Sequence, residues 1–306
     1  AWCSRLKRVK LGGAKDIGKE AFAWCAALEQ ITIPATTVEI GAGVLNGCNA
    51  LKTIEVEAGN PRYHSKGNCL IETKKKALLA GCPFSVIPDD GSVTNIGDEA
   101  FAGLETLTEI DIPATIEYLG NRVFDSCNAL KKLHIPASVQ CIDDGLTVAC
   151  ETLVELTVDK NNSMYHSAGN CIIDTESKSL VAGCGASVIP DDGSVTEIAE
   201  SAFVGLPLLK RLHIPAAVTE IADGAFCDLS ALETITVDRR NERYHSDGNC
   251  LIETDRDALI LGCNSSEIPD GVRSIESHAF CDCKFEHIRL PRGIRTIEDS
   301  AFRDCE

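Results

Sequence analysis

Cysteine and histidine are the residues of this 306-residue sequence whose spacing could support chemistry, because both bind metals and cysteines also form disulfides. Three segments share the motif Y-H-S-x-G-N-C, in which a histidine precedes a cysteine by five residues: His64/Cys69, His166/Cys171 and His245/Cys250. One His/Cys pair supplies half of a tetrahedral metal site, and the three segments lie roughly 80 and 100 residues apart. We therefore expect a turn at each motif's glycine, and neither a metal site nor a cofactor.

Each of these cysteines is followed by a second one thirteen residues later, which gives the pairs Cys69/Cys82, Cys171/Cys184 and Cys250/Cys263. If the two cysteines lie opposite each other in a hairpin, they are close enough to form a disulfide. A shift of one residue in the strand register would separate them. The sequence leaves both alternatives open, a disulfide or a pair of buried thiols.

Most other cysteines occupy one position of a repeated pattern, F-x-x-(C/L), where other copies carry leucine. The cysteines are Cys25, Cys48, Cys127, Cys150, Cys283 and Cys305, and the leucines are Leu104, Leu206 and Leu229. A position that accepts either residue is an apolar packing position, so these cysteines are predicted to be buried in the core. Cys3, Cys141, Cys227 and the Cys281-Asp282-Cys283 segment match no zinc spacing.

The pattern around these positions is a unit of about 23 residues, seen clearly from Ile96 to Pro113 as I-x-x-x-A-F-x-x-(C/L)-x-x-L-x-x-I-x-I-P. Its Ile and Phe anchors recur nine times, at Ile17/Phe22, Ile40/Leu45, Ile96/Phe101, Leu119/Phe124, Ile142/Thr147, Ile198/Phe203, Ile221/Phe226, Ile275/Phe280 and Ile297/Phe302. One repeat alone cannot bury its apolar side, but stacked repeats can. We predict a single solenoid over residues 1–306.

Three longer intervals between repeats contain insertions near residues 57–88, 159–190 and 238–269. In each, two apolar runs flank a polar centre, which is typical of a β-hairpin. The first two insertions return to the repeats through S-V-I-P and the third through E-I-P. The adjacent P-D-D-G-S segments lack the spacing of a calcium loop and are predicted to be turns.

Within one repeat, L-x-x-I-x-I-P alternates like a short strand that proline ends, and stacking would pair these strands into a continuous parallel sheet. The V-x-x-I stretch that follows is predicted to face the core from the other side. Next comes a short turn or helical segment, such as residues 97–103. The expected architecture is a right-handed α/β-type solenoid, mostly β with short helical or 3-10 turns and three β-hairpin insertions.

Composition excludes several classes of protein. The net charge of −17 argues against nucleic-acid binding, which needs clustered Lys and Arg. No apolar run approaches the ~18 residues of a membrane span. No catalytic motif such as G-x-S-x-G or H-E-x-x-H occurs, so no enzyme is expected. The chain begins and ends within a repeat, from which we expect a piece of a longer or processed protein.

The repeat resembles the BspA-like leucine-rich repeats, which have a period near 23, the I-G-x-x-A-F-x-x-C-x-x-L-x-x-I-x-I-P signature and interspersed hairpins of the Y-x-S-x-x-G-x-L kind. The resemblance covers essentially the whole chain. It departs at Thr147 and Leu45, where Phe is usual, and at the shortened Cys283-Lys284-Phe285. The resemblance implies a secreted or cell-surface protein that adheres to host matrix or to another cell.

The residues that would serve such a function are those facing outward from the predicted sheet. We predict a partner-binding strip formed by Glu109, Asp111, Lys131, Lys132, His134, Glu155, Thr157, Lys210, Arg211, His213, Glu233 and Arg289. Charges alternate between neighbouring repeats, which also fits a strip that is merely solvated and neutralises itself. The sequence favours a non-catalytic module that binds a protein or glycan, with a structural spacer displaying another domain as the alternative. It predicts neither the ligand nor the oligomeric state.

Overall fold

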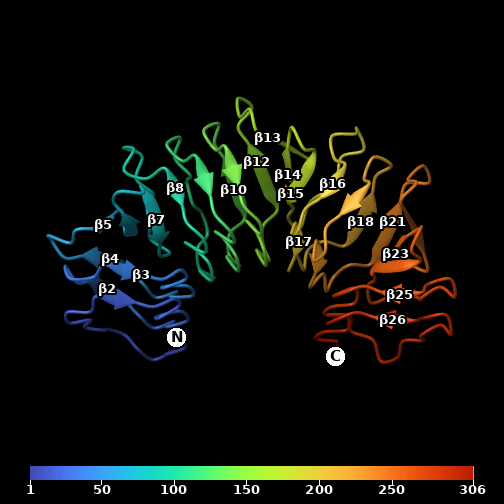
Figure 1. Ribbon diagram of the computed structural model, residues 1–306, viewed down its shortest axis with the longest axis horizontal. Helices are drawn as coiled ribbons and strands as arrows, with labels where there is room; N and C mark the ends of the chain where they lie inside the picture. The colour runs from blue at the N-terminus through green and yellow to red at the C-terminus, as the bar shows by residue number, and fades with distance from the viewer. Residues whose placement is uncertain (306) are drawn as a thin grey trace. The chain divides into compact units, whose positions relative to one another are not determined.

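The computed structural model describes residues 1–305 and contains 26 short strands in that range (Figure 1). The first eleven are β1 (Asp16–Ile17), β2 (Gln30–Ile33), β3 (Glu39–Ile40), β4 (Thr53–Val56), β5 (Tyr63–Lys66), β6 (Cys69–Glu72), β7 (Ala77–Ala80), β8 (Asn95–Ile96), β9 (Tyr118–Leu119), β10 (Lys132–Ile135) and β11 (Cys141–Ile142). The others are β12 (Glu155–Val158), β13 (Tyr165–Ala168), β14 (Cys171–Asp174), β15 (Ser179–Ala182), β16 (Glu197–Ile198), β17 (Phe203–Val204), β18 (Arg211–Ile214), β19 (Glu220–Ile221), β20 (Phe226–Cys227), β21 (Thr234–Val237), β22 (Tyr244–Asp247), β23 (Cys250–Glu253), β24 (Ala258–Leu261), β25 (Ser274–Ile275) and β26 (Thr296–Ile297).

The predicted helical turns are wrong, since none of the described residues forms a helix. The described chain accordingly contains no helix that could span a membrane. The A-F segments are instead successive tight turns. In each copy the residue before this dipeptide has a positive φ, for example Glu99 (φ 56), Ser201 (φ 59) and Gly224 (φ 71). A left-handed residue once per turn is incompatible with a right-handed helix.

The V-x-x-I stretches form the longest parallel ladders of the solenoid. In one sheet, β7, β8, β9 and β11 follow one another, and the matched residues include Leu78, Ile96, Leu119 and Ile142. Equivalent ladders join β15, β16 and β19, and β24, β25 and β26. The last strand of each insertion belongs to its ladder, so each insertion supplies a turn of its own. The solenoid accordingly has about 12 turns, while the sequence pattern shows nine repeats.

The predicted strands of L-x-x-I-x-I-P form in several repeats, for example as the parallel pairs β2–β4 and β18–β21. The prediction of one continuous sheet is wrong. Residues 108–112 and 286–290 carry the same pattern but lie in no strand of the described chain. Both segments follow an insertion, and the return segment that precedes each of them is not a strand either. The strand β18 also follows such a return segment but pairs with β21 of the next turn, whereas residues 108–112 and 286–290 pair with neither neighbour.

Each insertion contains three strands, where the sequence predicted a two-stranded hairpin. In the first insertion, β5 pairs antiparallel with β6 through the turn Gly67-Asn68, and β6 pairs antiparallel with β7. Both turn residues have positive φ, near 58 and 57, which is the geometry of a tight two-residue hairpin turn. The sequence missed β5 because the polar Y-H-S-K run has no apolar alternation.

A half-buried asparagine fixes the start of each insertion. Asn241 donates from Nδ2 to the carbonyls of Pro215 (2.8 Å) and Val218 (2.9 Å). Its Oδ1 accepts from the amides of Arg243 (2.9 Å) and Tyr244 (2.7 Å). Asn60 does the same in the first insertion, so one side chain holds each insertion to the turn before it.

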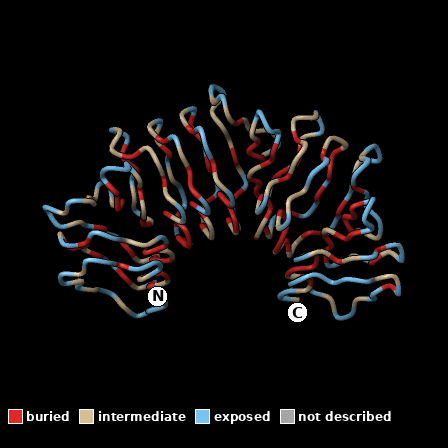
Figure 2. The backbone as a smooth tube through the Cα atoms, in the orientation of Figure 1, coloured by how far each residue is buried: buried red, intermediate tan, exposed pale blue. Residues whose placement is uncertain are grey.

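The core consists of Leu, Ile, Val, Phe and Cys side chains inside the turns, while exposed stretches alternate with buried ones along the chain (Figure 2). Phenylalanines of adjacent turns stack, as in Phe203 with Phe226 and Phe280 with Phe302. Contacts divide the chain into two compact units. The first comprises Ala1–Leu153 and Val158–Met164, and the second comprises Val154–Thr157 and the residues from Tyr165 onward. The single domain over residues 1–306 stays a prediction.

All 16 cysteines are free thiols. The hairpin pairs follow the buried-thiol alternative. The register places Leu70 opposite Ala80, so Cys69 is aligned with Gly81 and not with Cys82. The predicted core cysteines Cys25, Cys48, Cys127, Cys150 and Cys283 are buried, and Cys305 is partly buried.

Candidate functional site

The residues of the predicted strip point away from the core. Ten of them are exposed and two, Glu155 and Thr157, are half-buried. They do not form one continuous surface, because Glu109, Asp111 and Arg289 stand on segments that are not strands. In the second unit, the His213 imidazole Nδ1 lies 2.9 Å from the Thr236 hydroxyl, which joins neighbouring strands across the strip.

Three exposed apolar residues interrupt this polar surface where the insertions rejoin the repeats. We call residues 83–89 the first return segment and residues 185–190 the second. Phe84 and Val86 on the first are 59% and 71% exposed, and Val188 on the second is 67% exposed. Such large exposed fractions for adjacent apolar side chains mark a surface that contacts another molecule more often than a random position does.

The first return segment is held in place by the hairpin turn of its insertion. The Val86 amide donates to the Gly67 carbonyl at 2.8 Å. A side chain at Gly67 would meet the Val86 carbonyl oxygen at 2.0 Å, so only glycine allows this approach. The Ser85 hydroxyl donates to the Asn68 carbonyl at 2.7 Å. These bonds occupy the side of the segment that faces the hairpin and leave its other side open.

A groove of about 1160 Å³ lies between the first return segment and the next turn, which we call the first groove. It is lined by Lys66, Gly67, residues 83–89, Thr106, residues 108–111 and residues 113–115. The groove has an apolar wall at Phe84 and Val86 and an acidic wall at Glu109 and Asp111. Residues 108–112 make no hydrogen bond through their backbone within the described chain, so this wall offers unpaired amides and carbonyls.

A smaller cavity of about 480 Å³, the second groove, occupies the equivalent place beside the second return segment. Its lining residues are Ser187, Val188, Ile189, Phe203, Arg211, Leu212, His213, Thr234 and Thr236. The charged residues here are basic, whereas those on the wall of the first groove are acidic. The two grooves therefore suit ligands of different charge.

Ion pairs fix several of the charges near the grooves. Lys66 and Asp90 form a short ion pair at the edge of the first groove, and the Lys66 ammonium lowers the pKa of the Asp90 carboxyl. Asp89, Glu109 and Asp111 have no ion-pair partner among residues 1–305. In the second unit, Arg240 and its amide lower the pKa of Asp238 to about 2. The first groove thus keeps three carboxylates available for a ligand.

The hairpin histidines are engaged in structural contacts. The ring Nδ1 of His64 lies 2.8 Å from the Thr73 hydroxyl, and His166 and His245 make the same contact with Thr175 and Thr254 at 3.0 and 2.9 Å. The cysteine of each motif is buried, and its thiol lies beside the carbonyl of the hairpin glycine, as in Cys69 with Gly67 at 3.5 Å.

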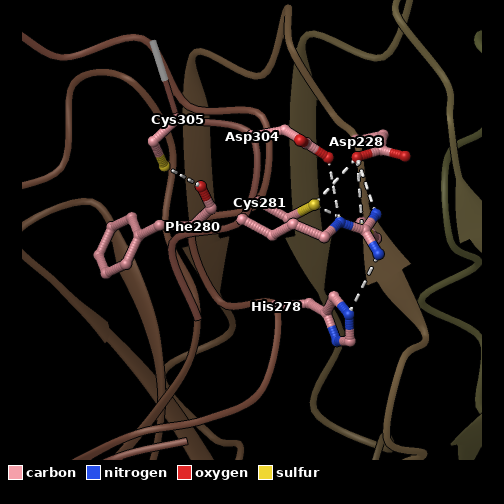
Figure 3. Close-up of polar contacts among 8 residues, drawn as sticks. Asp228, His278, Phe280, Cys281, Asp304 and Cys305 are labelled. Atoms are coloured by element: carbon pink, nitrogen blue, oxygen red, sulfur yellow. Dashed lines mark hydrogen bonds and ion pairs between the residues drawn. The ribbon is translucent and has the colours of Figure 1, made fainter. Parts of the chain in front are cut away.

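A cluster of two cysteines and an aspartate was not predicted from the sequence, and Figure 3 shows two of its members, Cys281 and Asp228. Cys227 Sγ lies 2.8 Å from Cys281 Sγ, and Cys281 Sγ lies 3.0 Å from Asp228 Oδ1. Arg303 reaches the same group, with Nη2 at 3.4 Å from Cys227 Sγ and 3.6 Å from Asp228 Oδ1. Its other terminal nitrogen lies 3.4 Å from the His278 ring.

Comparison with known families decides what kind of repeat this is. The profile of the BspA type leucine-rich repeat region matches the chain in six copies, over residues 1–67, 75–180, 183–247 and 261–306. The chain belongs to this leucine-rich repeat family. The prediction made from the repeat signature is confirmed, and the matched regions include all lining residues of both grooves.

Solved leucine-rich repeat structures resemble this family member to different extents. A leucine-rich cell surface protein from Faecalibacterium prausnitzii is 27% identical over 98% of this chain, with a TM-score of 0.45, and the alignment spans 66% of that protein. A leucine-rich repeat protein from Eubacterium ventriosum is 19% identical, with a TM-score of 0.50 over 95% of this chain and 80% of that one. The pneumococcal vaccine antigen PcpA is 18% identical over 89% of this chain and 68% of that one, with a TM-score of 0.44. A search of curated protein sequences finds no match.

The leucine-rich repeat pattern itself contained a signal for the missed groove residues. S-V-I-P ends in the same I-P as the repeat strand, so Ile87 is equivalent to Ile112 and Val86 to Asp111. Both isoleucines are buried and both preceding residues are exposed, as this alignment requires. The return segments therefore belong to the outward face, and Phe84, Val86 and Val188 extend the predicted strip.

Proposed function

We propose that this leucine-rich repeat chain is a non-catalytic binding module that recognises a protein or glycan through its two grooves, as part of a secreted or cell-surface protein. The observation that carries the proposal is the position of exposed Val86 and Val188 at equivalent places, each beside a groove. A surface valine gains free energy when a partner covers it, because burial removes apolar area from water.

Adhesion at a surface is supported by two further considerations. The family signature implies surface proteins, and the similar Faecalibacterium prausnitzii protein is described as a cell surface protein. The chain also carries a net charge of −17, which keeps a repeat surface soluble but disfavours contact with nucleic acid. Host matrix or another cell surface are the partners that we propose on this basis.

The test is a binding screen of the purified chain against arrays of extracellular proteins and of glycans. For any partner that the screen identifies, Val86→Glu or Val188→Glu is expected to weaken binding at least tenfold, depending on which groove the partner occupies. The reason is that the new carboxylate would have to be buried against the partner. Val38→Glu is the matched control, because Val38 is also exposed but lies in neither groove.

The alternative is a spacer that displays another domain of a longer protein. A spacer would bind nothing in either array, and its groove variants would behave like Val38→Glu. Binding that survives both groove variants unchanged would place the partner elsewhere and contradict the proposal.

A further inference from the structure

The wall of the first groove formed by residues 108–112 resembles the edge of an unfinished sheet. The segment has the repeat pattern of a strand, yet its amides and carbonyls have no hydrogen-bonding partner among the described residues. Ile87 also lines this groove, and its amide has no hydrogen-bonding partner within residues 1–305. Unpaired strand edges accept an added strand from another chain, through main-chain hydrogen bonds.

We propose that the first groove binds an extended peptide that adds to residues 108–112 as a strand and carries alternating basic and apolar side chains. The inference rests on the proposed binding function and names the class of partner for this groove. Its size of about 1160 Å³ exceeds the roughly 300–1,000 Å³ of common small-ligand pockets, which favours a peptide over a small molecule.

The side chains of the groove specify the alternation. Glu109 and Asp111 are exposed and two residues apart, so they lie on the same side of the extended segment. Residues on an added strand stand about 4.5–5.5 Å from those opposite, close enough for Lys or Arg to pair with each carboxylate. Residues of the peptide between these basic positions would point inward, toward the apolar lining residues Ile87 and Ile110.

The turn that follows the groove carries two lysines. Lys131 and Lys132 lie on it, but neither lines the groove. Within the lining, Lys66 is the only cation, and Asp90 neutralises it. The carboxylates of Asp89, Glu109 and Asp111 give the groove a net negative charge, so it selects a basic partner by electrostatic complementarity.

The test is titration of the whole chain with a fluorescently labelled peptide of alternating lysine and valine. A peptide of alternating glutamate and valine is expected to bind at least tenfold more weakly. Two further lysine-valine peptides carry N-methyl groups on alternate amides, one in each frame. Methylation in at least one frame is expected to abolish binding, because it removes the donors that face the groove edge.

The charge reversal Glu109→Lys with Asp111→Lys is expected to weaken binding of the lysine-valine peptide at least tenfold. Its control is Glu105→Lys with Glu117→Lys, which changes the net charge equally on exposed residues of the same unit outside the groove. Equal effects of the two double variants, or full binding of both methylated peptides, would overturn the proposal. If the lysine-valine peptide does not bind while a screened partner is lost in Val86→Glu, only this inference fails and the binding function stands.

A second inference comes from the thiol pair in the second unit. Each insertion turn carries Gly-Cys where other turns carry F-x-x-(C/L), so it is two residues shorter at this edge. Cys227 and Cys281 stand on the turns that flank the third insertion turn, which includes Gly262 and Cys263. The shortened turn leaves them in direct contact, with their sulfurs 2.8 Å apart.

We infer that Cys227 and Cys281 form a disulfide when the protein meets an oxidising low-molecular-weight disulfide. The Cys281 thiolate attacks one sulfur of the reagent, the S–S bond of the reagent breaks, and the other half of the reagent leaves as a thiolate. The Cys227 thiolate then attacks the Cys281 sulfur of the mixed disulfide and releases the remaining half. Two protein thiols lose their protons and two electrons, and the reagent is reduced to two thiols.

The surroundings favour this reaction over metal binding. A disulfide needs sulfurs about 2.05 Å apart, while two thiolates on one zinc ion at about 2.3 Å each must stand well beyond 3 Å from each other. The observed separation of 2.8 Å is closer to the disulfide. The Arg303 guanidinium also lies within 3.6 Å of Asp228 and repels a cation. Its charge opposes, without reversing, the rise in the pKa of Cys281 that burial and the Asp228 contact cause.

The test is incubation of the folded chain with oxidised glutathione, followed by alkylation in denaturant and peptide mapping. Two thiols of the 16 are expected to escape alkylation, in a cross-linked peptide that contains Cys227 and Cys281. Cys227→Ser should abolish the cross-link, whereas Cys171→Ser, which removes another buried thiol, should leave it intact. Full alkylation of both cysteines, or one zinc ion retained by the wild type and lost in Cys281→Ser, would overturn the inference.

Discussion

At the scale of single residues, a glycine takes the place of phenylalanine in the turn that each insertion adds. Gly81, Gly183 and Gly262 lie where other turns carry the stacked phenylalanine, and the phenylalanine of the next turn covers each glycine. A Cβ at Gly262 would meet Phe280 Cε1 at 2.0 Å, and Phe280 is fully buried. The ring cannot move aside without disturbing its stack with Phe302.

Gly262→Ala is therefore expected to lower the free energy of unfolding by about 1–3 kcal/mol, the usual cost of overpacking a core. Gly271→Ala is the control, because no atom lies within 4 Å of a Cβ added there, and it should change stability by less than about 0.5 kcal/mol. Urea unfolding followed by circular dichroism measures both. Equal midpoints for the two variants would show that the ring yields freely.

The buried thiols give the stability a defined pH dependence. Burial raises the pKa of Cys69 and of Cys171 to about 12 in the folded chain, whereas an unfolded cysteine has a pKa near 8.5. Below about pH 8.5 both states hold the proton and the contribution is fully present. Above it the unfolded chain releases the proton first, so stability is lost as the pH rises toward 12.

We expect the thermal unfolding midpoint to fall between about pH 8.5 and 11. Cys69→Ala should show a smaller fall than the wild type, because one thiol no longer opposes ionisation. Cys3→Ala, which removes an exposed cysteine, serves as the control and should follow the wild type. Parallel curves for all three proteins would exclude buried thiols as the source of the alkaline loss.

At the scale of elements, the repeat depends on one left-handed residue before each A-F dipeptide. Glycine meets this requirement in some turns, as at Gly224, and serine or a charged residue meets it in others, as at Ser201 and Glu99. A non-glycine residue in this conformation costs roughly 1–2 kcal/mol. The cost is borne because the tight turn brings the buried phenylalanine onto its stack.

Reciprocal substitutions test this account. Gly224→Ala should destabilise the chain by about 1 kcal/mol through backbone strain alone, since nothing lies within 4 Å of the added Cβ. Ser201→Gly should stabilise it by about 0.5–1 kcal/mol, because the strain is relieved. Urea unfolding midpoints compare the two variants. A loss of stability in Ser201→Gly would mean that the entropy of the unfolded glycine outweighs the strain.

The elements that the sequence predicted are those whose side chains alternate or repeat. Ile31 and Ile33 on β2 show why, since both are buried and the residue between them is not. The β5 strand was missed because its pairing is specified by the Gly67-Asn68 turn and not by an apolar pattern. Residues 108–112 were predicted as a strand but do not form one. A strand also needs hydrogen bonds to a neighbouring segment, and the alternating pattern of one segment does not encode that pairing.

The candidate site was predictable only in part for a related reason. Glu109, Asp111, Arg211 and His213 were found because they alternate with buried residues on the repeat pattern. Val86 and Val188 were missed because S-V-I-P was treated as the end of an insertion and not as a strand position. The contact of Cys227 with Cys281, 54 residues away, arises from the shortened turn between them. No short sequence motif contains both cysteines, so local spacing could not predict the contact.

At the scale of the whole molecule, net charge sets the response to salt. The chain carries 46 acidic and 29 basic side chains, so like charges repel across each unit at neutral pH. The ion pairs of residues 1–305 are mostly exposed, and such pairs contribute between about 0 and 1 kcal/mol each. Salt weakens both terms, but the excess of negative charge makes repulsion the larger one.

Raising sodium chloride from about 20 mM to about 500 mM at pH 7 should therefore raise the thermal unfolding midpoint, as the Debye length falls below the spacing of surface charges. The same increase in salt should weaken binding of the lysine-valine peptide, because its attraction to Glu109 and Asp111 is screened. Differential scanning calorimetry and the peptide titration measure the two effects on one preparation. A midpoint that falls with salt would show that ion pairs such as Arg256 with Glu253 outweigh the net repulsion. A peptide affinity that does not change with salt would mean that apolar contact at Phe84 and Val86 governs binding in the first groove.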